Sequence, residues 1–202
     1  AVTILCRYTH NPSQRHLNAA MHVLQYLKHA KGYGLLYKKA SNPTYQLHAF
    51  VDANWAGDLD TRHSTSGLVS VFCGCVISWV SQKQTIVATS TTEAEYVALS
   101  SMSKEILFLR NLLESIGFPQ KTSKIHADNM AANFLTEHAK VSTRTKHIDI
   151  KYHHIRELVE TKQVAVDHVD TKYNISDIAT KPLSKVRFYE LLKLFMYPIK
   201  SL

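Results

Sequence analysis

Residues 48–57 read HAFVDANWAG, in which apolar residues typical of a buried strand run directly into an aspartate, Asp52. A carboxylate is costly to bury unless another group compensates its charge, so its place here needs a reason. Two more β-rich runs follow, GLVSVFCG at 67–74 and VISWVSQ at 76–82, with a tight connection around Gly74. We therefore predict three consecutive antiparallel strands, with Asp52 at the end of the first.

The rest of the chain alternates between helical and strand patterns, without an internal repeat. The first helix is expected to begin with Asn11 as its N-cap and Pro12 at its first position, and the long central helix to stop at Gly117 and Pro119. The pattern predicts helices at about 11–32, 91–116, 129–135 and 147–160 and from about Asn174, and strands at 124–128 and 164–170. The predicted fold class is α/β, a five-stranded mixed sheet with helices on both faces, preceded by a helical segment.

Length and composition favour one main domain, since 202 residues with 45% hydrophobic content can bury one good core. No apolar run of about 18 residues and no signal-peptide pattern occur, which predicts an intracellular protein without membrane contact. The net charge is +8, and residues 1–44 hold six Lys and Arg and no Asp or Glu. Such a segment suits a polyanion such as nucleic acid, although an ordinary solvated helix face is the alternative.

Acidic residues fall where strands end and helices begin. Asp52 ends the first predicted strand, Asp128 ends the fourth, Glu93 or Glu95 lies on the long helix, and Asp177 begins the last helix. Taken singly, Asp52 also suits an Asx turn and Asp177 a favourable helix dipole. Gathered carboxylates repel one another unless cations neutralise them, and Mg²⁺ prefers such oxygen ligands. Two ions about 4 Å apart can activate water for phosphodiester hydrolysis.

Several long motifs resemble, in order, the ribonuclease H domain of copia-type LTR-retrotransposon Pol polyproteins. The segments are VDANWAGDLDTRHSTSG, ISWVSQKQTIVATSTTEAEYVALS, HADNMAANFL, TRTKHIDIKYHHIRE and ISDIATKPL. The match runs over about 45–195, and residues 6–39 are similar to the segment that tethers reverse transcriptase to that domain. The expected domains are therefore a tether at 1–44 and a ribonuclease H domain at 45–202.

The resemblance implies the ribonuclease H fold and its four catalytic, metal-binding acids. These acids match Asp52, Glu95, Asp128 and Asp177 here. It further implies two Mg²⁺ ions, with Mn²⁺ able to substitute, and an RNA·DNA hybrid as substrate. The implied partner is the reverse transcriptase domain of the same polyprotein, in the cytoplasm within a virus-like particle or in the nucleus. Integrases share the fold, but their catalytic acids form an Asp, Asp, Glu series without an acid on the first long helix. This chain has an acid on that helix, so it resembles the ribonucleases H instead.

Glu95 is favoured over Glu93 by a physical argument beside the resemblance. Ser90-Thr91-Thr92-Glu93 has the form of a capping box, which gives Glu93 a structural task at the start of the helix. Glu95 shares a stripe with Ala98, whose small side chain allows close approach to the sheet. We therefore expect Glu95 to be the metal ligand.

Substrate contacts are predicted around these acids. By resemblance, Ser90, Thr91 and Thr92 are candidates to bind phosphate at a helix N-terminus, and capping is the alternative role. Asn54 and Asn129, each near a catalytic aspartate, are candidates to contact sugar or base edges, with turn formation as the alternative.

Cellular ribonucleases H carry a histidine shortly before the last aspartate, and DTKYNISD at 170–177 has none. His168 is close by, but it falls in the predicted last strand. The sequence thus predicts a Mg²⁺-dependent endonuclease that cuts the RNA strand of RNA·DNA hybrids. The alternative hypothesis is a non-catalytic nucleic-acid-binding connection module that has kept the fold.

Overall fold

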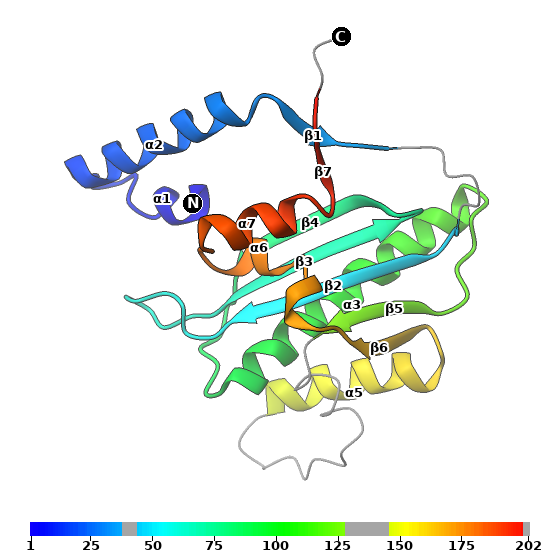
Figure 1. Cartoon of the computed structure of the whole chain (residues 1–202). Helices are drawn as coiled ribbons and strands as arrows, with labels where there is room; N and C mark the ends of the chain where they lie inside the picture. Colours follow the sequence, from blue (N-terminus) through cyan, green and yellow to red (C-terminus); the bar gives the residue numbers. More distant parts are fainter. Residues whose placement is uncertain (38–43, 128–145, 200–202) are drawn as a thin grey trace. The chain divides into compact units, whose positions relative to one another are not determined.

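The computed structural model describes residues 1–37, 44–127 and 146–199, with side chains left out at 146–149 (Figure 1). The chain forms two compact units. One holds Ala1–Leu36 together with the C-terminal residues from Met196, and the other holds Tyr37–Phe195. The predicted boundaries, 1–44 and 45–202, differ from this division most at the C-terminus, because a strand there pairs within the first unit.

The larger unit is built on a five-stranded sheet in the order β4-β3-β2-β5-β6. Its strands are β2 Leu47–Asn54, β3 Thr65–Phe72, β4 Cys75–Lys83, β5 Ser123–Ala127 and β6 Val164–His168. Strands β2, β3 and β4 pair antiparallel, whereas β5 pairs parallel with both β2 and β6. The predicted mixed sheet and its three consecutive antiparallel strands are confirmed. Cys73 and Gly74 join β3 to β4 with φ of 52° and 74°, the two positive values that a type I′ hairpin turn requires.

One face of this sheet carries the hydrophobic core. The long helix α3, Thr91–Ser115, packs against β2 and β3, and α5, Lys146–Glu160, packs against α3 and β6. Alternate residues of β2, among them Ala49 and Val51, are buried in one cluster with Leu99 of α3. The predicted long helix from Thr91 is confirmed to within a residue at its C-terminal end.

The opposite face of the sheet is covered by a short helix, α6, Asp177–Thr180, which contacts β2, β3 and β4 (Figure 1). Six of the eight residues of β3 are buried, as expected for a strand with helices on both faces. The prediction of one final helix from about Asn174 is wrong, because the segment from Thr171 onward folds in three pieces. These are the 3₁₀ turn η1 Thr171–Tyr173, α6, and α7 Lys185–Leu192, with Pro182 between the two α-helices.

The smaller unit contains two helices, α1 Val2–Cys6 and α2 Gln14–Ala30, and a two-stranded antiparallel sheet. That sheet pairs β1, Tyr33–Leu35, with β7, Met196–Pro198. Asn11 was predicted as the N-cap of the helix, and this is wrong. The cap is Ser13, whose hydroxyl and backbone N–H both contact Nδ1 of His16.

The helices in the described part of the chain include none that is long and apolar enough to cross a membrane. The helix predicted at 129–135 lies outside the described residues. The three cysteines, Cys6, Cys73 and Cys75, are free thiols.

Candidate active site

Two of the predicted site acids, Asp52 and Asp177, lie together on the face of the sheet that α6 covers. Their side chains are only 9% and 4% exposed. Asp52 was predicted to end its strand, but β2 continues for two more residues, to Asn54. The strand runs on because Ala53 and Asn54 remain paired with Ser66 and Thr65 of β3. Asp52 itself is paired with Gly67, whose lack of a side chain leaves room for α6.

Close packing on Gly67 fixes where α6 lies. A Cβ atom added to Gly67 would lie 2.5 Å from Cγ2 of Thr180 and 2.6 Å from the carbonyl oxygen of Ser176. The hydroxyl of Ser81 on β4 also donates a 2.6 Å hydrogen bond to the carbonyl oxygen of Ala179. Together these contacts hold the first turn of α6, and so Asp177, over the middle of the sheet.

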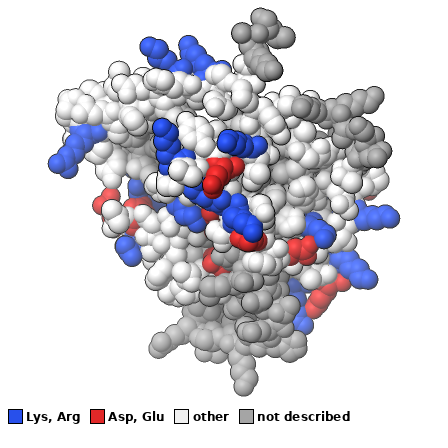
Figure 2. Space-filling model, in the orientation of Figure 1, with Lys and Arg blue, Asp and Glu red and all other residues white. Residues whose placement is uncertain are grey.

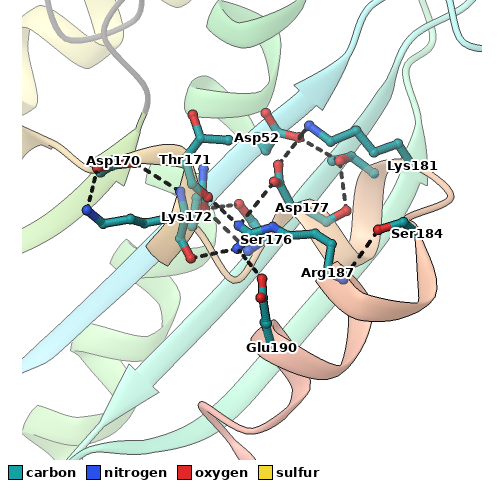
Figure 3. Close-up of polar contacts among 12 residues, drawn as sticks. Asp52, Asp170, Thr171, Lys172, Ser176, Asp177, Lys181, Ser184, Arg187 and Glu190 are labelled. Atoms are coloured by element: carbon teal, nitrogen blue, oxygen red, sulfur yellow. Dashed lines mark hydrogen bonds and ion pairs between the residues drawn. The ribbon is translucent and has the colours of Figure 1, made fainter.

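A lysine, Lys181, joins the two acids (Figure 3). Its Nζ lies 2.8 Å from Oδ1 of Asp177 and 3.4 Å from Oδ2 of Asp52. The Thr180 hydroxyl donates a 2.6 Å hydrogen bond to the same Oδ2 of Asp52. Arg187 lies on the far side of Asp177, with Nη2 at 3.7 Å from Oδ2. Both acids therefore have a positive or hydrogen-bonding neighbour on the protein itself.

A buried asparagine ties the segment before α6 to the strand that carries Asp52. Asn174 is 2% exposed, and its Nδ2 donates a 3.1 Å hydrogen bond to the carbonyl oxygen of Val51, the residue before Asp52. Its Oδ1 accepts hydrogen bonds from the backbone N–H and the hydroxyl of Ser176, the residue before Asp177. One side chain thus sets the spacing between the two acids through their neighbours in the chain.

Burial and neighbouring charges shift the pKa of Asp177 and of Lys181. Burial raises the pKa of Asp177 above its ordinary value, the negative charge of Asp52 adds to the rise, and the hydrogen bond from Lys181 only partly opposes it. For Lys181, burial alone would lower the pKa, but its contacts with Asp177 and Asp52 outweigh burial and raise it. The acid pair thus favours a nearby positive charge, and Lys181 stays protonated beside it.

Glu93 and Glu95 differ in surroundings as the capping argument predicts. The carboxylate of Glu93 accepts 2.6 Å hydrogen bonds from the backbone N–H and hydroxyl of Thr89, and its own N–H donates to the hydroxyl of Ser90, the N-cap of α3. The backbone partner is the residue before the N-cap, not the N-cap itself. Glu95 is half-buried in the first turns of α3, with its Oε2 shielded from solvent.

The other predicted site residues lie on β2, α3 and β6 or fall outside the described residues. Asp128 and Asn129 lie outside the described residues. Asn54 is the last residue of β2 and packs against the backbone of Gly57. Ser90 caps α3, Thr91 and Thr92 begin that helix on its exposed or half-exposed side, and His168 is the exposed last residue of β6.

Two residues of this arrangement, Asn174 and Lys181, were missed by sequence reasoning. An available signal was Asn174-Ile175-Ser176, since an asparagine two residues before a polar residue often forms an Asx turn. Lys181 follows Asp177 by four residues, which is the spacing of an ordinary helical ion pair, so its position did not mark it as a site residue.

The acid pair fits a hard divalent cation. Asp52 and Asp177 offer carboxylate oxygens, the ligands that Mg²⁺ prefers, in a place where positive charge is favoured and an ammonium group already lies between them. Over 1–37, 44–127 and 146–199, no group of three or more His, Cys, Asp or Glu side chains is placed to hold a metal ion. Asp128, one of the four predicted ligands, is not among those residues.

Comparison with known proteins finds retrotransposon polyproteins over nearly the whole chain. The Retrovirus-related Pol polyprotein from transposon TNT 1-94 of Nicotiana tabacum is 38% identical over 96% of this chain and 14% of its own length. The polyprotein from transposon RE2 of Arabidopsis thaliana is 39% identical over 93% of this chain and 13% of its own. The Ty1-ER2 Gag-Pol polyprotein of Saccharomyces cerevisiae is 25% identical over 95% of this chain and 11% of its own.

Solved structures similar to the chain include ribonucleases H1. The enzyme from Halobacterium salinarum NRC-1 gives a TM-score of 0.42 at 19% identity, covering 62% of this chain and 86% of that one. LC11-RNase H1 in complex with an RNA/DNA hybrid gives 0.48 at 15% identity, covering 64% and 88%. No family model matches the chain.

The strand order, the change from antiparallel to parallel pairing and the helices on both faces define an α/β ribonuclease H-like fold. The chain belongs to the ribonuclease H-like domains of copia-type retrotransposon Pol polyproteins. It spans about 14% of the length of the tobacco polyprotein and 13% of those from Arabidopsis.

Proposed function

We propose that the chain is an endonuclease that hydrolyses the RNA strand of RNA·DNA hybrids during reverse transcription. The observation that carries the proposal is the pair of buried carboxylates, Asp52 and Asp177, brought together from a strand and a helix and bridged by a cation of the protein. Such a pair has little structural reason to exist, because two buried charges in contact cost free energy that apolar side chains would not.

Four acids would hold the metal in this proposal. Asp52 and Asp177 supply two of them, and Glu95 and Asp128 are the other proposed ligands. When bound, two Mg²⁺ ions would supply an activated water and stabilisation of the leaving oxygen. The chain itself holds Asp52 in place through Thr180, and sets the position of Asp177 through Asn174 and Gly67.

Substrate contacts are assigned to the start of α3 and the end of β2. The Ser90 hydroxyl accepts from Glu93, which leaves its own O–H free to donate to a phosphate oxygen. Backbone N–H groups and the dipole at the start of this 25-residue helix favour the same anion, beside Thr91 and Thr92. Asn54, and Asn129 outside the described residues, are proposed to contact sugar or base edges.

The partners proposed are an RNA·DNA hybrid and the reverse transcriptase domain of the same polyprotein. Membership of the Pol family supports the second partner, since the relatives are polyproteins several times longer than this chain. The net positive charge of the first 44 residues, which hold six Lys and Arg and no Asp or Glu, supports the first partner.

The test compares cleavage of four labelled duplexes or strands by the 202-residue chain in Mg²⁺. We expect cuts in the RNA strand of an RNA·DNA hybrid, and none in duplex DNA, duplex RNA or single-stranded RNA. Asp177→Asn is the matched inactive control, because it keeps the size of the side chain and removes its charge. Equal cleavage of duplex DNA, or equal activity of wild type and Asp177→Asn, would contradict the proposal.

A further inference from the structure

The contacts of Lys181 place a positive charge of the protein where the proposed function requires a metal. Nζ of Lys181 lies 2.8 Å from Asp177 and 3.4 Å from Asp52, so the ammonium group uses one oxygen of each carboxylate. These are oxygens that a bound divalent ion would also need, at the shorter distance of about 2.0–2.1 Å typical of Mg²⁺. An ammonium group and a metal ion therefore compete for the same ligands.

We propose that Lys181 is a built-in counter-ion that holds Asp52 and Asp177 together in the metal-free protein and is displaced when a divalent cation binds. Lys181 thereby sets the affinity of the site for metal and prevents the two acids from repelling each other apart when metal is absent. The inference rests on the proposed function, because it takes this pair to be a metal site.

Lys181, and not Arg187, is built to move. The Arg187 guanidinium donates hydrogen bonds to the carbonyl oxygens of Thr171 and Lys172, and its side chain is 22% exposed. Among the described residues, Nζ of Lys181 contacts only carboxylate oxygens, those of Asp52 and Asp177, and the side chain is 36% exposed. A lysine carries a compact charge on a flexible four-carbon stem, so it can turn toward water without breaking backbone contacts. Arg187 would stay beside Asp177 in both states.

The position of Lys181 in the fold lets its side chain contact both acids. It is the residue after α6, where the backbone leaves the helix in an extended conformation with φ of −143° and ψ of 155°. The helix before it is pinned to β3 at Gly67, so Asp177 and Thr180 stay in place when the lysine side chain moves. Displacement therefore requires rotation of one side chain and no shift of an element.

The test measures Mn²⁺ binding by electron paramagnetic resonance of the free ion, together with melting of the metal-free protein in EDTA. Lys181→Met keeps the stem and removes the charge, Lys181→Gln keeps hydrogen-bond donors without charge, and Lys181→Arg keeps the charge. We expect Lys181→Met and Lys181→Gln to bind Mn²⁺ about tenfold more tightly than wild type, and to melt at a lower temperature in EDTA. Lys181→Arg should remain within about threefold of wild type.

Lys83→Met is the matched control. Lys83 is 34% exposed and pairs at 3.4 Å with the buried Asp58, so this variant removes the same charge from a similar ion pair. It should lower the melting temperature and leave Mn²⁺ affinity unchanged. If one Lys181 variant does not fold, the other neutral variant gives the same comparison.

The outcomes separate this inference from the proposed function. If wild type and both neutral variants bind Mn²⁺ with the same affinity, the proposed role of Lys181 is wrong, whereas the proposed metal site is still supported. Tighter binding in Lys83→Met as well would show a general effect of charge and also overturn it. If neither wild type nor any Lys181 variant binds Mn²⁺, the metal site itself is contradicted.

Discussion

At the scale of single residues, two glutamates two positions apart on α3 have different tasks. Glu93 stabilises the start of the helix through its hydrogen bonds from Thr89, whereas Glu95 is free of that task and is the proposed ligand. We expect Glu95→Gln to abolish hybrid cleavage without loss of stability. Glu93→Gln, which can still accept hydrogen bonds, should keep most activity, and Glu93→Ala should lose about 1 kcal/mol of unfolding free energy.

Single-turnover cleavage and urea unfolding of the three variants check this division. Loss of turnover in Glu93→Gln with retained turnover in Glu95→Gln would reverse the assignment.

Two histidines on the face of the sheet that carries Asp52 should make stability depend on pH. His48 of β2 and His126 of β5 lie with ring centroids 5.7 Å apart, and Phe50 stacks on His126. Burial lowers the pKa of both, and for His48 the neighbouring charge of His126 lowers it further. Because the folded protein then binds fewer protons than the unfolded chain, stability is lost as pH falls below about 6.5.

Replacing both rings removes that dependence. The double variant His48→Gln, His126→Gln should lose less unfolding free energy than wild type between pH 7.5 and pH 5.0, as measured by urea unfolding at each pH. If the wild type and the double variant lose the same unfolding free energy between pH 7.5 and pH 5.0, these two histidines do not cause the pH dependence.

Some residues of the site could be predicted from the sequence, and others could not. Asp52 and Asp177 were predicted as site residues because each lies next to the end of an apolar run or the start of a helix. Lys181 and Asn174 were not, because their partners Asp52 and Val51 are more than 120 positions away in the chain. Only the register of the sheet and the packing of α6 bring such partners together.

At the scale of elements, the site depends on how closely α6 approaches β3. Gly67→Ala would place a Cβ within 2.6 Å of the Ser176 carbonyl oxygen, a backbone atom that cannot turn aside. We expect a loss of about 1–3 kcal/mol of unfolding free energy, typical of overpacking, and a larger proportional loss of cleavage as α6 moves away from Asp52. Gly32→Ala is the control, since a Cβ there meets nothing within 4 Å.

Thermal unfolding and hybrid cleavage of both variants check the prediction. Unchanged activity in Gly67→Ala would mean that the separation of α6 and β2 is not what holds the acid pair.

Elements with strong local signals were predicted, and those set by distant contacts were not. The long helix α3 has Ser90 as its N-cap and Gly117 after its end, and both follow from the local sequence. The last helix was predicted as continuous although Pro182 separates α6 from α7. Strands β1 and β7 have three residues each and pair across more than 160 positions, so neither shows a period that a local pattern can reveal.

At the scale of the whole molecule, basic side chains outnumber acidic ones. The chain carries 24 Lys and Arg against 16 Asp and Glu. On the face shown in Figure 2, basic and acidic side chains interleave near the middle, over α6 and α7. The proposed nuclease function would use both kinds of side chain, since acids would bind the metal and bases would attract the phosphate of the same phosphodiester.

The central claim is that this acid pair catalyses cleavage and does not merely belong to a nucleic-acid-binding module. The measurement is hybrid affinity and single-turnover RNA cleavage on wild type and Asp52→Asn, in Mg²⁺ and again in Mn²⁺. Asp52→Asn removes one negative charge near the scissile phosphate, so affinity should be equal or higher. Cleavage should fall by orders of magnitude, because a misplaced metal loses both water activation and leaving-group stabilisation. Wild type that binds the hybrid without cutting it in either metal, and behaves like Asp52→Asn, would contradict the account.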